Sequence, residues 1–391
     1  MSPKVEPHPP LSQGRAQTDS LFDLVKPEAL YERPIPERHR IIFYLGHLEA
    51  FDWNLLGRAL DLPSFHPTFD HLFSFGIDPE SSGLPTDQPR DWPAEEEVRD
   101  YNTRVRAALD RALAQAPAEL MHVAIEHRLM HAETFAYILH HLPFAHKTAP
   151  EYSVAPSLPA PQVRMVEIPA GSATLGRRRG AGFGWDNEFE QHQVDLPAFS
   201  IAQHKVTNGD YLEFVKAGAA APHFWTCRDG QWCYHGMFED IPLPLDWPVY
   251  VSHDQAQAYA RWKGKVLPTE AQFHRAAYRD GADDVAPFAR ENVDFRSWDP
   301  EPVTASPPNH YGVSQLVGNG WEWTATPFAP FAGFEPFPYY PGYSANFFDG
   351  RHYVLKGGSP RTALCLLRPT FRNWFRPSYP YIYATFRLVE S

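Results

Sequence analysis

The stretch IEHRLMHAETF, Ile125–Phe135, decides the fold of the first part of the chain. It lies within Pro117–His141, a segment whose apolar residues recur at helical spacing. His127 and His131 are four residues apart, so a helix places both imidazoles on the same face. Two imidazoles on one helix face suit a metal ion, because neutral imidazole binds iron, zinc, copper and nickel.

A third histidine belongs with this pair. His47 lies among apolar residues in Pro36–Leu60, which also has helical spacing, and in a bundle it can face the other two. Three neutral imidazoles on one side of an ion leave positions open for substrate and O₂, as a catalytic metal site requires. Two other interpretations stay open. The histidines are core or surface residues, or two of them bind iron together with Glu49, Asp52 or Glu133.

The helical pattern extends over residues 18–146 and predicts a four-helix bundle. Its expected helices are Ser20–Lys26, Pro36–Leu60, Ala94–Leu113 and Pro117–His141. Residues 1–17 are expected to form a disordered leader. The connection Pro63–Pro93 is long and rich in proline, and such loops usually carry function or short helices.

The character of the sequence changes after a proline-rich connector, residues 147–161, which marks the boundary between two domains. Beyond it, short apolar runs alternate with Gly, Pro, Asn and Asp: Met165–Ile168, Phe199–Ile201 and Tyr353–Leu355. Two helices are expected, Ser252–Lys263 and Thr269–Tyr278, while Trp321–Tyr343 shows no regular pattern. We therefore expect an irregular α+β domain over residues 162–391, held together by aromatic packing.

Composition excludes several classes of protein. Of the 391 residues, 43% are hydrophobic and 21% charged, which rules out a wholly disordered chain. A net charge of −12 gives no electrostatic basis for binding nucleic acid. Three cysteines cannot build a disulfide framework, and no segment resembles a targeting signal or a membrane span of about 18 apolar residues. We expect a soluble, cytoplasmic protein; its oligomeric state does not follow from sequence.

These motifs resemble a known pair of domains. Gly46-His47 on an early helix, with His127, His131 and Glu133 on the last one, resembles the DinB-like domain of the EgtB-type ergothioneine sulfoxide synthases. The second half resembles the formylglycine-generating-enzyme (sulfatase-modifying-factor) fold, a C-type-lectin-like domain. Its matching stretches include Met165–Gly176, Leu267–Phe273 and Gly318–Thr324. The expected fold class is therefore α+β with two domains, a DinB-like four-helix bundle followed by a lectin-like domain.

The resemblance implies an Fe(II)- and O₂-dependent enzyme that forms a C–S or C–Se bond on the imidazole of hercynine, Nα-trimethylhistidine. It makes His47, His127 and His131 the iron ligands and Asn373 and Trp374 the residues that bind hercynine. An indole face attracts a quaternary ammonium by cation–π interaction, worth ~0.5–2 kcal/mol. An asparagine amide can donate a hydrogen bond to the carboxylate of the substrate.

The second substrate donates sulfur or selenium. We infer its identity from positions where this sequence differs from the family pattern. In relatives that use γ-glutamylcysteine, the loop between the first two long helices carries several arginines. Here that loop has a single arginine, Arg90. Phe375 follows Trp374 where those relatives have aspartate, and Met130 precedes His131 where many have glutamine. A site without these charges suits a less charged donor. We therefore predict a selenoneine synthase of the SenA type, which uses a selenosugar. The alternative is an EgtB-type ergothioneine synthase that uses cysteine or γ-glutamylcysteine, and a minor one is a non-catalytic lectin-like binding protein.

Further candidates follow from the same resemblance. The family's usual tyrosine-containing segment is PFAGF here, Pro330–Phe334, so the tyrosine that the resemblance implies as the catalytic acid is not found in it. The candidates for this acid are Tyr340, Tyr343 and Tyr353. The candidates for binding the donor are Arg90, Arg372, Arg376 and Phe375, and Glu133 and Met130 are expected beside the metal ligands.

Overall fold

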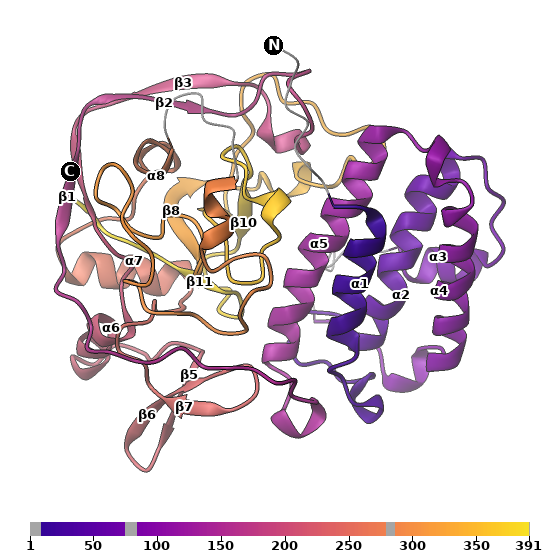
Figure 1. Cartoon of the computed structure of the whole chain (residues 1–391), viewed down its shortest axis with the longest axis horizontal. Helices are drawn as coiled ribbons and strands as arrows, with labels where there is room; N and C mark the ends of the chain where they lie inside the picture. The colour runs from indigo at the N-terminus through magenta and orange to yellow at the C-terminus, as the bar shows by residue number, and fades with distance from the viewer. Residues whose placement is uncertain (1–8, 75–83, 279–285, 391) are drawn as a thin grey trace. The chain divides into compact units, whose positions relative to one another are not determined.

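The structure is a computed structural model that describes residues 9–74, 84–278 and 286–390. Two compact units divide the chain: a helical unit, Pro7–Glu151, and a mixed unit, Tyr152–Ser391 (Figure 1). The division falls within the predicted connector, residues 147–161. No helix in the described part of the chain is both long enough and apolar enough to cross a membrane.

In its described residues, the helical unit is a bundle of four long helices with one short helix inserted. Its helices are α1 (Leu11–Phe22), α2 (Ile41–Asp52), α3 (Pro67–Leu72), α4 (Glu95–Asp110) and α5 (Ala118–His140). Helix α5 packs against α1 and α2, and α4 packs against the other side of α2. Most residues of α2 and α5 are buried, so these two helices form the centre of the unit. A π-helical turn, Trp53–Gly57, continues α2.

Helix α1 corrects two expectations. It begins at Leu11, inside the predicted disordered leader of residues 1–17, and it ends at Phe22, so Ser20–Lys26 is not a separate helix. The segment is polar in sequence, yet it buries Arg15, whose guanidinium donates to Asp110 Oδ1 at 2.6 Å. An ion pair to a residue 95 positions away lets a polar segment pack against the bundle.

The connection Pro63–Pro93 contains α3, while residues 75–83 lie outside the described part of the chain. Helix α3 starts with Pro67 at its first position, where proline is favoured. Its Asp70 carboxylate accepts hydrogen bonds from the Tyr101 hydroxyl at 2.7 Å and from the Ser64 hydroxyl at 2.5 Å. These bonds fix α3, and with it the buried Phe73, against the bundle.

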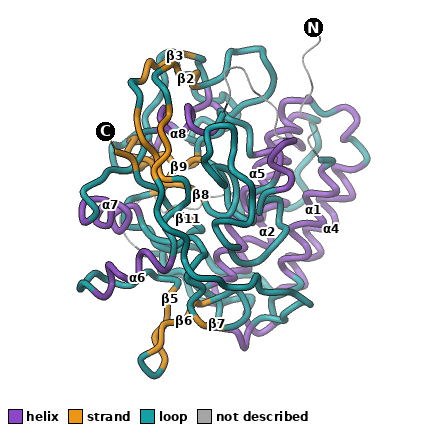
Figure 2. Tube along the Cα trace, turned by 60° about the vertical axis from the view of Figure 1, so that its left-hand side comes forward, coloured by secondary structure: helices purple, strands orange, loops and turns teal. Residues whose placement is uncertain are grey.

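The mixed unit has short strands joined by long loops (Figure 2). One sheet has the order β1-β4-β12, from β1 (Met165–Ile168), β4 (Phe199–Ala202) and β12 (Val389–Glu390). A second has the order β10-β9-β8-β11, from β10 (Asn373–Phe375), β9 (Tyr353–Lys356), β8 (Trp321–Pro327) and β11 (Ala384–Thr385). Strands β2 (Gly171–Leu175) and β3 (His192–Leu196) form a pair, and β5 (Trp225–Arg228), β6 (Gln231–His235) and β7 (Asp240–Pro242) form a third sheet.

In the described part of this unit, three α-helices accompany the sheets: α6 (Asn208–Lys216), α7 (His253–Trp262) and α8 (Glu270–Ala277). Each begins with a Ser or Thr whose side chain accepts from a backbone N–H three residues later. Helices α7 and α8 confirm the expected segments Ser252–Lys263 and Thr269–Tyr278 to within two residues at each end.

Strand β8 corrects the expectation that Trp321–Tyr343 is irregular throughout. Residues 321–324 are all buried, so the strand shows no alternation of polar and apolar residues. Its Glu322 carboxylate lies in the core and accepts from Lys205 Nζ at 2.6 Å and from Arg387 Nε at 2.7 Å. Two cations from distant parts of the chain thus compensate one buried anion.

Candidate metal centre and substrate residues

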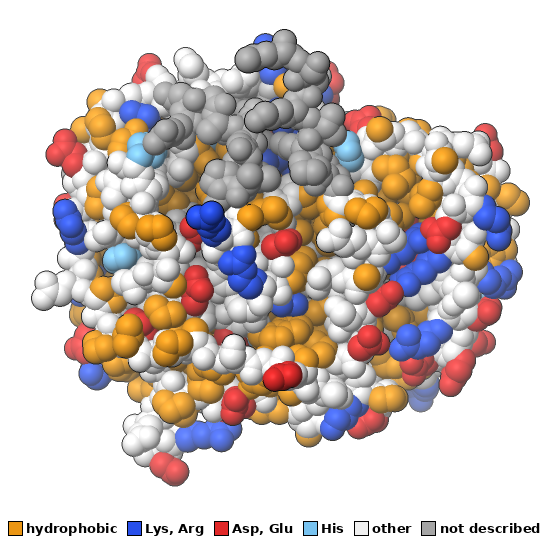
Figure 3. Space-filling view, in the orientation of Figure 1, with side chains coloured by type: hydrophobic (Ala, Val, Ile, Leu, Met, Phe, Trp, Pro, Cys, Tyr) orange, Lys and Arg blue, Asp and Glu red, His pale blue; other side chains and the backbone are white. Residues whose placement is uncertain are grey.

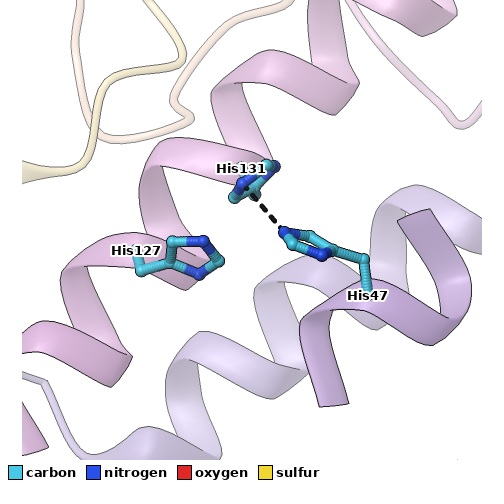
Figure 4. A group of neighbouring side chains, drawn as sticks. All are labelled: His47, His127 and His131. Atoms are coloured by element: carbon cyan, nitrogen blue, oxygen red, sulfur yellow. Dashed lines mark hydrogen bonds between the residues drawn. The ribbon is translucent and has the colours of Figure 1, made fainter. Parts of the chain in front are cut away.

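Helices α2 and α5 bring His47, His127 and His131 together (Figure 4). One nitrogen of each imidazole lies within 4.8 Å of the corresponding nitrogen of the other two. His47 Nε2 and His131 Nε2 are 3.3 Å apart. Among the described residues this is the only group of three His, Cys, Asp or Glu side chains with this geometry.

Burial sets the protonation state of the three imidazoles. It lowers the pKa of His47 to about 4, and it lowers the pKa of His127 and of His131 well below the ordinary value. Charging these groups is unfavourable because they are 2–6% exposed and lie beside one another. All three are therefore neutral at pH 7, which is the form that binds a metal. Three facing neutral imidazoles form a donor set that fits a transition-metal ion such as iron.

Aromatic rings enclose the group. The Phe51 ring stacks on His127 with centroids 3.4 Å apart and an interplanar angle of 8°. The Phe43 ring stacks on His47 at 4.9 Å. These rings restrict the orientations of both imidazoles and supply an apolar wall around the nitrogen atoms. A metal held here would lie in an environment of low polarity, where charges interact more strongly than in water.

The carboxylates weighed as alternative ligands have other partners. Arg128, fully buried on α5, lies 3.1 Å from the Glu49 carboxylate and 2.6 Å from the Asp52 carboxylate. Burial raises the pKa of Asp52 to about 6. Glu133 is buried on α5 but is not part of the close group, and Met130 beside His131 is half-buried. The geometry therefore supports a site of three histidines over one of two histidines and a carboxylate.

His47 Nδ1 donates a hydrogen bond, 2.7 Å long, to the backbone oxygen of Phe73. The sequence did not predict this contact. Phe73 itself gives no signal, because a backbone carbonyl is common to every residue. A glycine inside a helix and next to a ligand, Gly46, is the available signal, since it often marks a close approach by another segment.

In the mixed unit, Asn373 and Trp374 lie on β10, whose partner in the sheet is β9. The Trp374 ring stacks on Phe328 at 4.3 Å with an interplanar angle of 6°. The Tyr343 ring meets it edge-on at 5.4 Å. Asn373 Oδ1 accepts from the backbone N–H of Trp374 at 2.9 Å. Both residues are half-buried, so Trp374 is both a packing residue and a partly accessible one.

The three tyrosine candidates separate into two places. Tyr340 and Tyr343 lie side by side, with ring centroids 5.6 Å apart, and Tyr343 also stacks on Trp185 at 3.9 Å. Burial raises the pKa of Tyr340 to about 12, so its hydroxyl keeps its proton at neutral pH. Tyr353, on β9, stacks instead on His253 at 3.8 Å. The structure thus brings Tyr343 to Trp374 and leaves Tyr353 with a different partner.

Arg372, a candidate for donor binding, lies in a buried ion pair in the structure. Arg372 is 2% exposed, and its guanidinium donates to both oxygens of Glu270, at 2.9 and 3.1 Å. A third donor atom bonds the backbone oxygen of Ala329 at 3.0 Å. The residue is thus a buried ion-pair partner. Arg90 and Arg376 are exposed, and Phe375 is half-buried.

Each of the two units matches a known protein family. Residues 11–144 match the DinB superfamily, and residues 151–391 match the sulfatase-modifying factor enzyme 1-like domain. Fold and site together define a two-domain protein of α+β class, in which a DinB-type bundle carries a histidine group and a sulfatase-modifying-factor-type domain follows.

Among curated proteins, the chain is 33% identical to "Hercynine oxygenase" of Mycolicibacterium smegmatis, over 97% of each chain. It is 32% identical to "Hercynine oxygenase" of Mycolicibacterium thermoresistibile, over 88% of this chain and 85% of that one. The chain belongs to the hercynine oxygenase family. It is also 28% identical to "Ergothioneine biosynthesis protein 1" of Schizosaccharomyces pombe, over 94% of this chain, and it spans about half (54%) of that longer relative. None of the three names refers to selenium.

Proposed function

We propose that this protein is an iron- and O₂-dependent enzyme that joins a thiol donor to the imidazole ring of hercynine, as an ergothioneine synthase of the EgtB type does. The observation that carries this proposal is the group of three buried, neutral histidines on α2 and α5. Membership of the hercynine oxygenase family supports the substrate, and the name of the fungal relative, an ergothioneine biosynthesis protein, supports sulfur over selenium. We place the reaction in the cytoplasm, since the three cysteines are free thiols.

The three histidines divide the work of holding iron between two helices. His127 and His131 come from consecutive turns of α5, and His47 approaches from α2, so their rings converge on one point (Figure 4). Three protein ligands leave coordination positions open for O₂ and the donor. Iron bound there would supply the activation of O₂ and the one-electron chemistry of the reaction. The rings of Phe43 and Phe51 keep bulk water from the side they cover.

Hercynine would be recognised by Asn373 and Trp374. Its trimethylammonium group donates no hydrogen bond, so an aromatic face is a suitable receptor. Because Asn373 Oδ1 accepts from the backbone N–H of Trp374, the amide is oriented with Nδ2 as its donor toward a carboxylate. Of the tyrosine candidates, Tyr343 is the one that touches Trp374, and Tyr340 lies next to it. We propose that this pair holds the proton the reaction needs.

A selenosugar donor, as in a SenA-type selenoneine synthase, is the second candidate. It is favoured by the pairing of Arg372 with Glu270, which leaves one arginine fewer for a charged donor. Phe375 likewise supplies no charge next to Trp374. Arg90 and Arg376, both exposed, remain the candidates for contacting a carboxylate of γ-glutamylcysteine.

The test offers the iron-loaded protein hercynine together with cysteine, γ-glutamylcysteine or a selenosugar and follows O₂ consumption and products by mass spectrometry. Elemental analysis first establishes the iron content. We expect O₂ consumption that requires hercynine and a thiol. Preference for the selenosugar would replace sulfur by selenium in the proposal. Binding of hercynine with no O₂ consumption from any donor would leave a lectin-like binding protein.

A further inference from the structure

The outer nitrogen of His47 has a defined partner. His47 Nδ1 lies 2.7 Å from the backbone oxygen of Phe73, at the end of α3. A carbonyl oxygen only accepts hydrogen bonds, so the proton of this bond must belong to Nδ1. A neutral imidazole carries one N–H, and His47 is neutral because it is buried. Nε2 is therefore left with a lone pair, and this atom faces His131 Nε2 at 3.3 Å.

Phe73 lies very close to α2 at the residue before His47. A Cβ atom built on Gly46 would lie 2.6–2.7 Å from three carbon atoms of the Phe73 ring, closer than real Cβ atoms approach their neighbours. The Phe73 ring is fully buried and packs against Phe69, with centroids 5.4 Å apart, and against Trp92 at 6.2 Å. Only glycine at position 46 lets the Phe73 ring pack this close to α2, and with it the Phe73 backbone carbonyl reaches His47.

Both ends of the hydrogen bond are fixed by other contacts. Asn54, two residues after the end of α2, donates to the Asp70 backbone oxygen at 2.8 Å, and Tyr101 on α4 donates to the Asp70 side chain at 2.7 Å. These bonds hold α3, which ends at Leu72, immediately before Phe73. On the other side, the Phe43 ring stacks on the His47 imidazole and restricts its rotation.

We propose that the backbone carbonyl of Phe73 is a positioning group that holds His47 in its Nδ1–H tautomer and so directs the Nε2 lone pair at the metal, and that Gly46 is required for this approach. The proposal rests on the proposed metal site for its consequence, but the tautomer itself is a property of the metal-free protein. Outer hydrogen bonds to metal-binding histidines typically change metal affinity by roughly 10–100-fold when they are lost.

The first test measures the tautomer directly in metal-free protein. Long-range ¹H–¹⁵N spectra of protein labelled with ¹⁵N-histidine distinguish an Nδ1–H from an Nε2–H imidazole, and the His47 signals are identified by their loss in His47→Gln. We expect the Nδ1–H tautomer for His47 in wild-type protein. An Nε2–H tautomer overturns the proposal, whatever the protein binds.

The second test introduces Gly46→Ala. The added methyl group must displace the Phe73 ring, so we expect a mixture of His47 tautomers and a roughly 10–100-fold weaker affinity for Co²⁺, followed by its visible absorption. Gly14→Ala is the matched control, because a Cβ at this buried helical glycine meets Arg128 at an ordinary 3.5 Å. The control should keep the wild-type tautomer and affinity.

A folded Gly46→Ala protein with an unchanged tautomer and unchanged Co²⁺ affinity overturns the proposal. If Gly46→Ala does not fold, Phe73→Leu provides the test, because the smaller side chain loosens the carbonyl without crowding α2, and the same loss of tautomer preference is expected. Combining Phe73→Leu with Gly46→Ala should relieve the clash and restore folding. A third outcome separates the two proposals. If wild-type protein shows the Nδ1–H tautomer but takes up no metal, the proposed function is wrong and the assigned hydrogen bond is still correct.

Discussion

His47 and His131 are 84 residues apart in the sequence, yet their Nε2 atoms lie 3.3 Å from each other in the centre of the helical unit. At this distance in a buried setting, two imidazole nitrogens either share a proton or together bind an ion. His131 Nδ1 is buried without a hydrogen-bond partner among the described residues, which is costly unless the ring serves another purpose. The arrangement thus lowers the folding free energy gained by the helical unit, and in return it places imidazole nitrogens where they can bind an ion.

We predict that His131→Ala abolishes binding of iron, because two histidines alone leave too few protein ligands. Iron content measured by elemental analysis after reconstitution should fall from near one per chain to background, and turnover should fall with it. His122→Ala, a half-buried histidine on the same helix but outside the group, is the control and should load normally. Full iron loading and turnover by His131→Ala would refute the site.

Stability of the metal-free protein should fall as pH drops from about 6.5 toward about 4. The pKa of His47 is lowered to about 4 in the folded protein, so the unfolded state binds the extra proton over that range. The full effect of His47 is about 3 kcal/mol of unfolding free energy at pH 4 and below, and it is absent above about pH 7. Urea unfolding at a series of pH values measures it.

In the same series, His47→Gln should show a shallower pH dependence, because one titrating group has been removed. His127 and His131 keep the remainder of the slope, since burial lowers the pKa of each in the same direction. A slope identical to that of the wild-type protein would mean that His47 is not buried in its neutral form.

Arg128→Met should destabilise the helical unit by ~3–5 kcal/mol, since it leaves the buried carboxylates of Glu49 and Asp52 without this cation. The control is Arg104→Met, which removes an exposed pair to Asp100 at 3.7 Å. That pair should be worth less than ~0.5 kcal/mol. Unfolding free energies from denaturant titration compare the two, and equal losses would show that the buried cluster is not coupled to folding.

Trp374→Leu should weaken binding of hercynine by roughly 2–30-fold, which corresponds to a cation–π interaction of ~0.5–2 kcal/mol. Binding of histidine, which has a primary ammonium in place of the trimethylammonium, should change less. Trp262→Leu serves as the control because Trp262 is 43% exposed on α7, and Asn373 and Trp374 lie on a different element, β10. Calorimetric titration gives both affinities, and equal affinity of wild type and Trp374→Leu would remove Trp374 from the site.

Local patterns were sufficient for much of the helical unit. Apolar residues at helical spacing predicted α2, α4 and α5, because these helices have faces buried in the bundle. The i, i+4 spacing of His127 and His131 predicted that two imidazoles lie together, without any tertiary information. Helix α1 escaped detection because its buried Arg15 depends on Asp110, and no local pattern indicates a partner 95 residues away.

The site residues show the same division. Arg372 looked available in the sequence because its partner, Glu270, lies 102 residues earlier. The role of Phe73 depends on its backbone, which the identity of the residue does not reveal. Trp321–Pro327 lacked alternation because both faces of the strand are buried, so a central strand looked like an irregular segment. What depends on long-range pairing could not be predicted from spacing.

The ion-paired Glu322 in the core of the mixed unit has a consequence for biosynthesis. Its partner Arg387 belongs to residues 384–390, which also supply β11 to one sheet and β12 to another. During translation, Glu322 cannot pair with Arg387 until residues 384–390 have left the ribosome. The mixed unit therefore completes its folding only at the end of synthesis. The helical unit has all three histidines by residue 131 and can bring them together while more than half of the chain is still being made.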